Sequence, residues 1–194
     1  MNLILASSSP RRYQLLKDAG LTFKVIKPHV EETIPRKFNI YKVAECLAKI
    51  KSNSLPEPKS NEVIITADTV VILGKKILGK PKNKRQAVKM LMSLSARCHS
   101  VVTGVCLRSA TKSISFSEKS KVFFHKVKPN EIIYYVNNFC PYDKAGAYGI
   151  QDWFGLRFIK RVEGCFYNVM GLPVSRVLAE LEKMKLLMET QKLN

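Results

Sequence analysis

Hydroxyl and guanidinium side chains gather at residues 7–12, which read Ser-Ser-Ser-Pro-Arg-Arg. A short apolar run precedes them, so we predict a strand that leads into a helix capped by Ser9. Unpaired backbone N–H groups at such a helix start, with Ser7, Arg11 and Arg12 beside them, would form a phosphate site. The same string also fits a plain capped helix with two exposed arginines, and by itself it favours that interpretation.

Lys51 occupies an unusual position for a charged residue. A helix is predicted at residues 39–53, and Lys51 follows Leu47 by one turn, within the apolar stripe of that helix. Its ammonium either turns inward towards an anion or extends along the surface to water. The spacing leaves both interpretations open.

Asp68 follows the apolar, β-branched run 63–66, which we predict to be a central strand. An acid at the end of such a strand lies where α/β sheets usually place catalytic groups. Its carboxylate could hold Mg²⁺ together with substrate phosphates, or orient a water molecule; a turn residue or a structural ion pair is the alternative. Glu31 and Glu32, in an early polar loop, are candidates for a second metal ligand, although paired loop acids are commonly just solvated.

Two further segments carry polar groups that could meet a nucleotide. Lys80 lies in a Gly-Lys-Pro string within the lysine-rich run 75–85, most of which we expect to be solvated surface. The full Walker spacing is missing, which excludes a P-loop. Gln151 ends the segment 143–151, whose small residues allow close backbone approach. Its amide could pair with the edge of a base, and a tight structural crossover is the competing account.

Alternating strands and helices must position these residues. Apolar and β-branched runs predict strands at 2–6, 22–27, 63–67, 99–108, 113–125 and 157–162, with a hairpin over 70–78. Amphipathic spacing predicts helices at 10–19, 39–53, 84–95, 130–139 and 173–188. Because hairpins interrupt the alternation, we expect an α/β fold with a mixed twisted sheet flanked by helices. A single domain over 1–194 is expected, with two lobes, a central cleft and a frayed tail from about residue 183.

Composition limits the class of protein. The 194 residues carry 33 Lys and Arg against 15 Asp and Glu, a net charge of +18. The hydrophobic share of 46% suits a globular core and excludes disordered and coiled-coil classes. The five cysteines are scattered, which excludes a zinc framework, and neither a signal peptide nor a membrane span is evident, so a cytoplasmic protein is expected. The charge fits a nucleic acid, a solvated surface or one polyanionic small molecule.

Taken together, these segments resemble the Maf-like nucleotide pyrophosphatases over nearly the whole chain, from Leu3 to about Leu181. The motifs that carry the resemblance are Leu-Ala-Ser-Ser-Ser-Pro-Arg-Arg-x-x-Leu-Leu at 5–16, Val-Glu-Glu at 30–32, Leu-Ala at 47–48 with Lys51, Ala-Asp-Thr-Val-Val at 67–71, Gly-Lys-Pro at 79–81, residues 143–151 and Asn-Val-Met-Gly-Leu-Pro at 168–173. The resemblance implies a fold related to the inosine triphosphate pyrophosphatases. It also implies hydrolysis of a nucleoside triphosphate between the α and β phosphates, which yields a nucleoside monophosphate and pyrophosphate.

Within that family, Asp68 matches the aspartate regarded as the proton acceptor that activates water. The resemblance places Arg12, Lys51 and Lys80 around the phosphates, and Ser7 in the first loop. Asp68 and Glu32 would hold the divalent cation, which is Mg²⁺, Mn²⁺ or Co²⁺.

Three positions resemble specificity markers of the subgroup that acts on dTTP and UTP, namely Arg11, Thr69 and Gln151. The expected partner is therefore a nucleoside triphosphate, with no stable nucleic-acid complex and no membrane; a homodimer is left open. Modified pyrimidine triphosphates are a further substrate class. The alternatives from other classes are a cell-division regulator that acts through binding and a basic nucleic-acid-binding module.

Overall fold

The computed structural model describes residues 1–28 and 39–190, with side chains to residue 185, and it divides the chain into two compact units. The first unit consists of Met1–Asp68, Thr103–Glu118 and Gly171–Asn194. The second consists of Thr69–Val102 and Lys119–Met170. The expectation of one domain over the whole chain stays a prediction.

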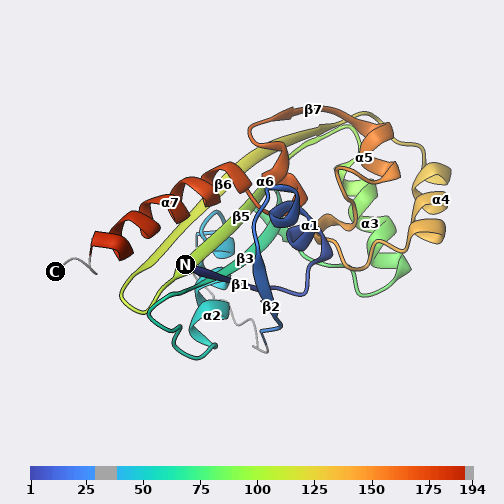
Figure 1. Ribbon diagram of the computed structural model, residues 1–194. Coiled ribbons are helices and arrows are strands. Elements are labelled where there is room, and N and C mark those ends of the chain that lie inside the picture. The colour runs from blue at the N-terminus through green and yellow to red at the C-terminus, as the bar shows by residue number, and fades with distance from the viewer. Residues whose placement is uncertain (29–38, 191–194) are drawn as a thin grey trace. The chain divides into compact units, whose positions relative to one another are not determined.

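Each unit has its own helices, while three long strands contribute residues to both. Figure 1 labels these elements. The first unit holds β1 (Asn2–Ala6), α1 (Pro10–Asp18), β2 (Phe23–Ile26), α2 (Val43–Asn53) and α7 (Val174–Thr190). The second holds β4 (Lys76–Leu78), α3 (Lys84–Leu94), α4 (Pro129–Phe139), the 3₁₀ turn η1 (Ala145–Ala147), α5 (Trp153–Phe158), β7 (Ile159–Glu163) and α6 (Phe166–Met170). The strands β3 (Glu62–Leu73), β5 (Cys98–Arg108) and β6 (Ser113–Phe124) have residues in both units.

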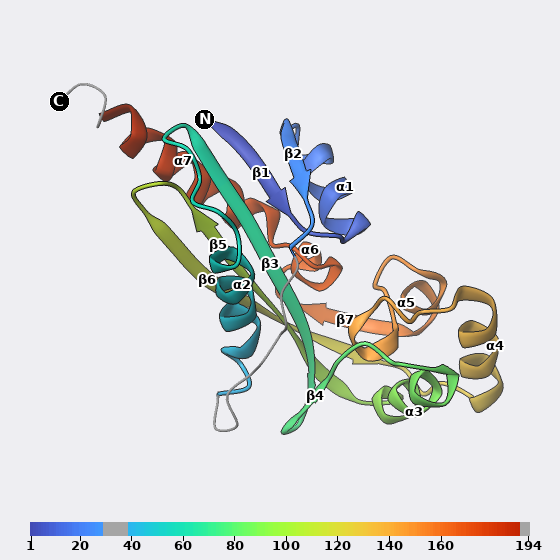
Figure 2. The same cartoon turned by 90° about the horizontal axis from the view of Figure 1, so that it is seen from below.

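The strands form a mixed sheet, hydrogen-bonded in the order β2-β1-β3-β5-β6-β7 with β4 paired to β3. In the first unit β1 runs parallel to both of its neighbours, as Figure 2 shows. Leu5 lies opposite Val25 on β2 and Ile65 on β3. In the second unit the β3–β4 and β6–β7 pairs are antiparallel. The predicted mixed α/β class is confirmed.

Local sequence signals account for the helix boundaries. Ser9 caps α1, since its side chain accepts a hydrogen bond from the backbone N–H of Arg12 at 3.5 Å. Gly20 follows the helix with a φ of 77°, a left-handed conformation that glycine adopts without strain. Asn83 caps α3 in the same way, accepting from the N–H of Gln86 at 3.0 Å. The predicted cap at Ser9 and the predicted glycine after the first helix are therefore confirmed, while the cap at Asn83 was not predicted.

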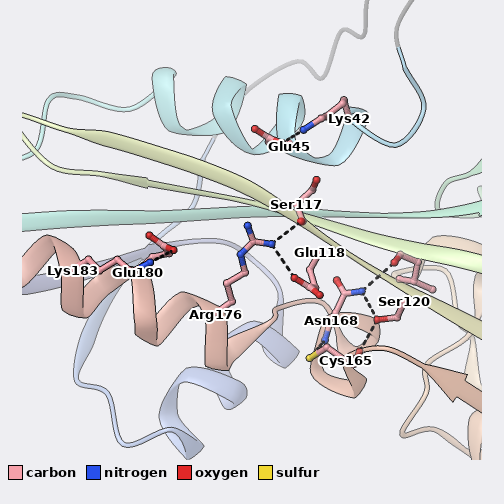
Figure 3. Close-up of polar contacts among 11 residues, drawn as sticks. Lys42, Glu45, Ser117, Glu118, Ser120, Cys165, Asn168, Arg176, Glu180 and Lys183 are labelled. Carbon is pink, nitrogen blue, oxygen red and sulfur yellow. Dashed lines mark hydrogen bonds and ion pairs between the residues drawn. The ribbon is translucent and has the colours of Figure 1, made fainter.

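In the first unit, α2 and α7 cover opposite faces of the strands (Figure 3). Arg176 on α7 ties that helix to β6: its Nη1 donates to the carbonyl of Ser117 and to Oε2 of Glu118, both at 3.0 Å. Its guanidinium also lies over the ring of Phe116, 4.3 Å from the ring centroid. The helix predicted at 173–188 is therefore confirmed as α7 and is docked through its first turns.

Buried apolar side chains fill both units. In the first, Leu5, Leu16 and Ile65 are fully buried; in the second, Tyr135 and Phe154 are the largest fully buried side chains. Burial of this kind supplies most of the free energy that holds such units together. Among the described residues, no helix combines the length and the apolar character needed to cross a bilayer.

Two features differ from the predictions. First, Asp68 does not end a strand, because β3 continues without interruption from Glu62 to Leu73. Neither glycine nor proline breaks this stretch, and the β-branched Thr66 and Thr69 lie close to the acid on either side, so the extended conformation continues. Second, α5, α6 and η1 were not predicted. Each is too short to show a helical repeat of apolar residues.

Candidate functional site

Asp68 lies on β3 at the end of the first unit, with its side chain 14% exposed. Residues two apart on a strand face the same side of the sheet, so Asp68 shares its face with Thr66, which is fully buried. The carboxylate therefore projects from a packed strand whose conformation is set by the core beneath it. Such a position holds a reactive group more firmly than a loop does.

Lys51 turns inward and forms an ion pair with Asp68. Its Nζ donates to Oδ1 of the carboxylate, and its side chain is 13% exposed. The interpretation in which Lys51 extends to water is therefore wrong, because its ammonium turns inward to a carboxylate of the same chain. This is the ion pair weighed above as the alternative for Asp68, and the contact of Lys51 with substrate phosphates stays a prediction. Because both groups are largely removed from solvent, their attraction is screened less than at a surface.

Two contacts set the position of α2, the helix that carries Lys51. The hydroxyl of Thr66 donates to the carbonyl oxygen of Ala48 at 2.7 Å, which joins β3 to α2. At Gly104 on β5, a Cβ would overlap the backbone of Ala44, so the helix lies directly on the strand. Ala48 precedes Lys51 by one helical turn, and Thr66 precedes Asp68 by one strand repeat. The Thr66–Ala48 bond thus fixes the spacing between α2 and β3 at the point where Lys51 contacts Asp68.

The first loop is held together by Ser7. Its Oγ accepts from the backbone N–H of Ser9 at 3.1 Å and from Nη1 of Arg12 at 3.4 Å, and the residue is buried. Ser7 therefore organises the turn between β1 and α1. Its role towards a substrate stays a prediction.

The two arginines of this loop have different surroundings. Arg12 is 9% exposed, and its guanidinium donates to backbone carbonyls: Nε to Gly171 at 2.8 Å and Nη1 to Ala67 at 2.8 Å. The plain interpretation with two exposed arginines is wrong for Arg12. Arg11 is half-buried, and its predicted contact with a substrate stays a prediction. Arg12 links the first loop, the residue before Asp68 and the start of the segment that leads to α7.

The second unit contains the remaining predicted site residues. Thr69 is half-buried on β3, directly after Asp68, while Lys80 is exposed after β4 and Gln151 is exposed before α5. The backbone N–H of Gly146 donates to the carbonyl of Gly79 at 3.0 Å. This bond joins the segment that ends in Gln151 to the string that contains Lys80, so the structure brings these two predicted segments together within one unit.

The rest of the lysine-rich run is surface, as predicted. Lys75, Lys76, Lys82, Lys84 and Arg85 are all exposed. Their charges are solvated and act on a ligand only as a long-range attraction that salt screens.

A cation site can be tested only in part. Glu32 lies outside the described residues, and within residues 1–28 and 39–185 no three His, Cys, Asp or Glu side chains cluster as metal ligands would. Mg²⁺, however, is commonly held by one or two carboxylates together with substrate phosphates and water. Asp68 alone, with one oxygen on Lys51, is compatible with that mode of binding.

Sequence reasoning overlooked two residues that the structure makes prominent. The first is Thr66, whose hydroxyl two residues before an acid on the same strand face is a signal that the sequence contains. The second is His99. It is 2% exposed, and its Nε2 lies 2.6 Å from the hydroxyl of Tyr148 in the segment that ends in Gln151.

Comparison with known proteins gives a consistent family assignment. The sequence profile described as "Maf-like protein" matches residues 2–184. A protein of Cytophaga hutchinsonii named "dTTP/UTP pyrophosphatase" is 44% identical over 183 residues, which cover 94% of this chain and 84% of that protein. A protein of Flavobacterium johnsoniae with the same name is 44% identical over 176 residues, covering 90% and 91%.

Among solved structures, the Ham1 protein of Staphylococcus aureus aligns with a TM-score of 0.45 and 16% identity, over 64% of this chain and 72% of that one. A likeness of this extent carries no argument about function.

Proposed function

The chain belongs to the Maf-like family, and from that premise we propose that it is a nucleoside triphosphate pyrophosphatase that hydrolyses dTTP and UTP. The observation that carries the proposal is the 40–44% identity to proteins named dTTP/UTP pyrophosphatase, which extends over at least 90% of this chain. The carboxylate of Asp68, which Lys51 holds in place, is the group that we assign as the proton acceptor. The products are the nucleoside monophosphate and pyrophosphate.

In the proposed reaction, a water oxygen attacks the α phosphorus while the bond from that phosphorus to the bridging oxygen of the β phosphate breaks. The water proton passes to the carboxylate of Asp68, and pyrophosphate leaves with the bond electrons. Lys51 holds Oδ1 of this carboxylate, which leaves Oδ2 as the oxygen that we assign to the water. The ion pair therefore acts by orientation: it keeps the acceptor in one rotamer during the attack.

Cationic and hydroxyl groups stabilise the charge that develops on the phosphates. We assign this role to Lys80, with Arg11 and Ser7 as further substrate contacts, because a positive charge that faces the leaving group lowers the transition-state energy. Arg12 contributes differently. Since its guanidinium donates to the carbonyl of Ala67, it supports the backbone next to Asp68 as well as the phosphate loop.

Base recognition is assigned to Gln151, with Thr69 as a second specificity residue. A primary amide offers a donor and an acceptor side by side, which matches the O4 and N3–H edge shared by thymine and uracil. Gln151 is exposed, as a residue that receives a ligand must be. When the amide is held in the orientation that pairs with thymine, the exocyclic amine of cytosine at the same edge would face the amide nitrogen, which is another donor.

The family implies a divalent cation, and the carboxylate chemistry fits one. We propose that Glu32 and the substrate phosphates hold it, and that Asp68 reaches it only by way of the water whose proton it accepts. When bound, the ion would neutralise phosphate charge and polarise the phosphoryl oxygen.

The test is a substrate panel with the full chain. Purified protein is incubated with dTTP, UTP, the other standard triphosphates and modified pyrimidine triphosphates, in the presence of Mg²⁺, Mn²⁺ or Co²⁺. We expect pyrophosphate and the monophosphate from dTTP and UTP, and loss of turnover in Asp68→Asn. Release of orthophosphate instead of pyrophosphate, or full activity of Asp68→Asn, would contradict the proposal.

A further inference from the structure

His99 is buried in the second unit at a position where a polar ring is costly. The side chain is 2% exposed, and burial lowers the pKa of its imidazole to about 4, so the ring is neutral near pH 7. Among the described residues its Nδ1 has no hydrogen-bond partner. A buried unpaired polar atom destabilises a fold, so packing alone does not explain why a histidine stands here.

Within the part of the chain that the structure describes, the polar contact of this ring is with Tyr148. Nε2 of His99 lies 2.6 Å from the tyrosine hydroxyl, which is itself buried. The hydroxyl proton needs an acceptor, and a neutral Nε2 supplies one. Burial also raises the pKa of Tyr148 well above its ordinary value, so the bond joins two neutral groups throughout the range near neutral pH.

Aromatic packing holds the same pair in place. His99 meets Tyr148 edge to face at 5.4 Å between ring centroids, and Phe124 contacts both rings, at 5.1 Å from His99 and 4.9 Å from Tyr148. These ring contacts limit lateral movement of the Tyr148 ring. The hydrogen bond to His99 fixes how deeply the ring is inserted into the core. Tyr148 is thereby a fixed point of its segment.

The backbone that follows Tyr148 is confined up to Gln151. A Cβ at Gly155 of α5 would overlap the carbonyl oxygens of Gly149 and Ile150, so α5 lies directly against this stretch. On the other side of Gln151, the carboxylate of Asp152 lies 3.4 Å from Nζ of Lys144 and accepts from the hydroxyl of Tyr135 at 3.5 Å. Gln151 is thus an exposed residue between two anchored neighbours.

We propose that His99 is a positioning residue for base selection: through the hydroxyl of Tyr148 it holds the segment that presents Gln151 to the nucleobase. The inference rests on the proposed function, since it assigns His99 to the substrate choice of that same enzyme. His99 touches no substrate in this arrangement. Its effect reaches the base through Tyr148 and the short stretch of backbone that ends in Gln151.

The test compares base selectivity in variants that break or keep this bond. Tyr148→Phe removes only the hydroxyl, His99→Leu removes the imidazole, and His99→Gln keeps a side-chain acceptor. The readout is kcat/KM for dTTP divided by kcat/KM for dATP. We expect Tyr148→Phe and His99→Leu to lower this ratio about three- to tenfold, mainly through the KM for dTTP, and His99→Gln to recover much of it.

Three controls separate positioning from general damage. His125→Leu changes an exposed histidine of the same unit and should leave the ratio unchanged. The double variant of His99→Leu and Tyr148→Phe should be no worse than the more affected single variant, because both remove one bond. In a Gln151→Ala background, His99→Leu should lower the ratio no further. Amide hydrogen exchange at residues 149–152 should be faster in Tyr148→Phe than in the His125 control.

The outcomes distinguish this inference from the proposed function. Absence of dTTP and UTP hydrolysis by the unmodified chain would overturn both. If Gln151→Ala lowers the ratio while Tyr148→Phe and His99→Leu leave it unchanged, His99 is not a positioning residue and the proposed function stands. A further loss from His99→Leu in the Gln151→Ala background would equally overturn the inference, since the effect would not pass through Gln151.

Discussion

The hydroxyl of Thr66 donates to the carbonyl of Ala48 across 2.7 Å, and this bond joins the strand that carries Asp68 to the helix that carries Lys51. One strand repeat separates Thr66 from Asp68, and one helical turn separates Ala48 from Lys51. The ion pair between Lys51 and Asp68 therefore depends on how α2 packs against the sheet. The close contact between this helix and Gly104 on β5 also fixes that packing.

Removal of the Thr66 hydroxyl should loosen this docking. Thr66→Val keeps the shape of the side chain, so we expect a loss of about 1 kcal/mol in the free energy of unfolding and a fall in kcat that exceeds any change in KM. Urea unfolding and steady-state kinetics on dTTP measure both. Thr22→Val, at an exposed threonine, is the control and should change neither quantity. An unaltered kcat in Thr66→Val would show that the Lys51–Asp68 geometry does not depend on this bond.

Replacement of Lys51 should impair the chemical step. Lys51→Met leaves the Asp68 carboxylate without the ammonium that orients it, and we expect kcat to fall at least about tenfold with a smaller effect on KM. Lys49→Met is a matched control on the same helix, because Lys49 is 52% exposed and pairs with Glu45 instead. If both variants lose activity equally, the loss comes from the helix charge and not from the ion pair.

Replacement of the two arginines of the first loop should have different effects, on stability for Arg12 and on substrate binding for Arg11. Arg12→Lys loses the directed bonds to the carbonyls of Gly171 and Ala67, so it should lower the free energy of unfolding by about 2 kcal/mol or more. Arg11→Lys should change stability by less than about 1 kcal/mol and act on the KM for dTTP instead. Thermal unfolding and kinetics on the two variants check this. A stable Arg12→Lys would mean that these carbonyl contacts contribute little.

The buried imidazole of His99 predicts acid sensitivity. The pKa of His99 is about 4 in the folded chain, against an ordinary 6.5. Between these two values the imidazole is protonated in the unfolded chain and neutral in the folded chain. The stability associated with this group is complete above pH 6.5 and is lost progressively as the pH falls towards 4. It amounts to roughly 2 kcal/mol between pH 7 and 4.5.

His99→Leu isolates this contribution, because the carboxylates titrate alike in both proteins. Urea unfolding of the two chains at several pH values should give a difference in stability that shifts in favour of His99→Leu as the pH falls. A constant difference from pH 7 to 4.5 would contradict the depressed pKa.

Much of the fold could be predicted because its signals are local. The cap at Ser9, the glycine after α1 and the β-branched runs all act within a few residues of one another, and each corresponding element is present. The continuation of β3 past Asp68 was missed because the acid was read as the end of an apolar run. The neighbouring strands that keep it extended are contributed by distant parts of the chain.

The site was predictable in its residue types and less so in its contacts. The periodicity that placed Lys51 in an apolar stripe could not say what filled the space beyond it; the answer, Asp68, lies on another element. Arg12 donates a hydrogen bond to a carbonyl that is 159 residues away in the sequence. Since every residue has a backbone carbonyl, the residue type at the acceptor position does not reveal this contact. The bond between His99 and Tyr148 was out of reach for the same reason, since the two residues are 49 positions apart in the sequence.

That distant contact of Arg12 also bears on when the protein becomes active during its synthesis. The carbonyl of Gly171 is one of the acceptors for the guanidinium beside Asp68, and the first unit draws on the start, the middle and the last part of the chain. A growing polypeptide on the ribosome would already contain Asp68, Lys51, Lys80 and Gln151 while this acceptor was still missing. Turnover should therefore begin only after residue 171 has left the ribosome, and an incomplete translation product would carry the reactive residues without their support.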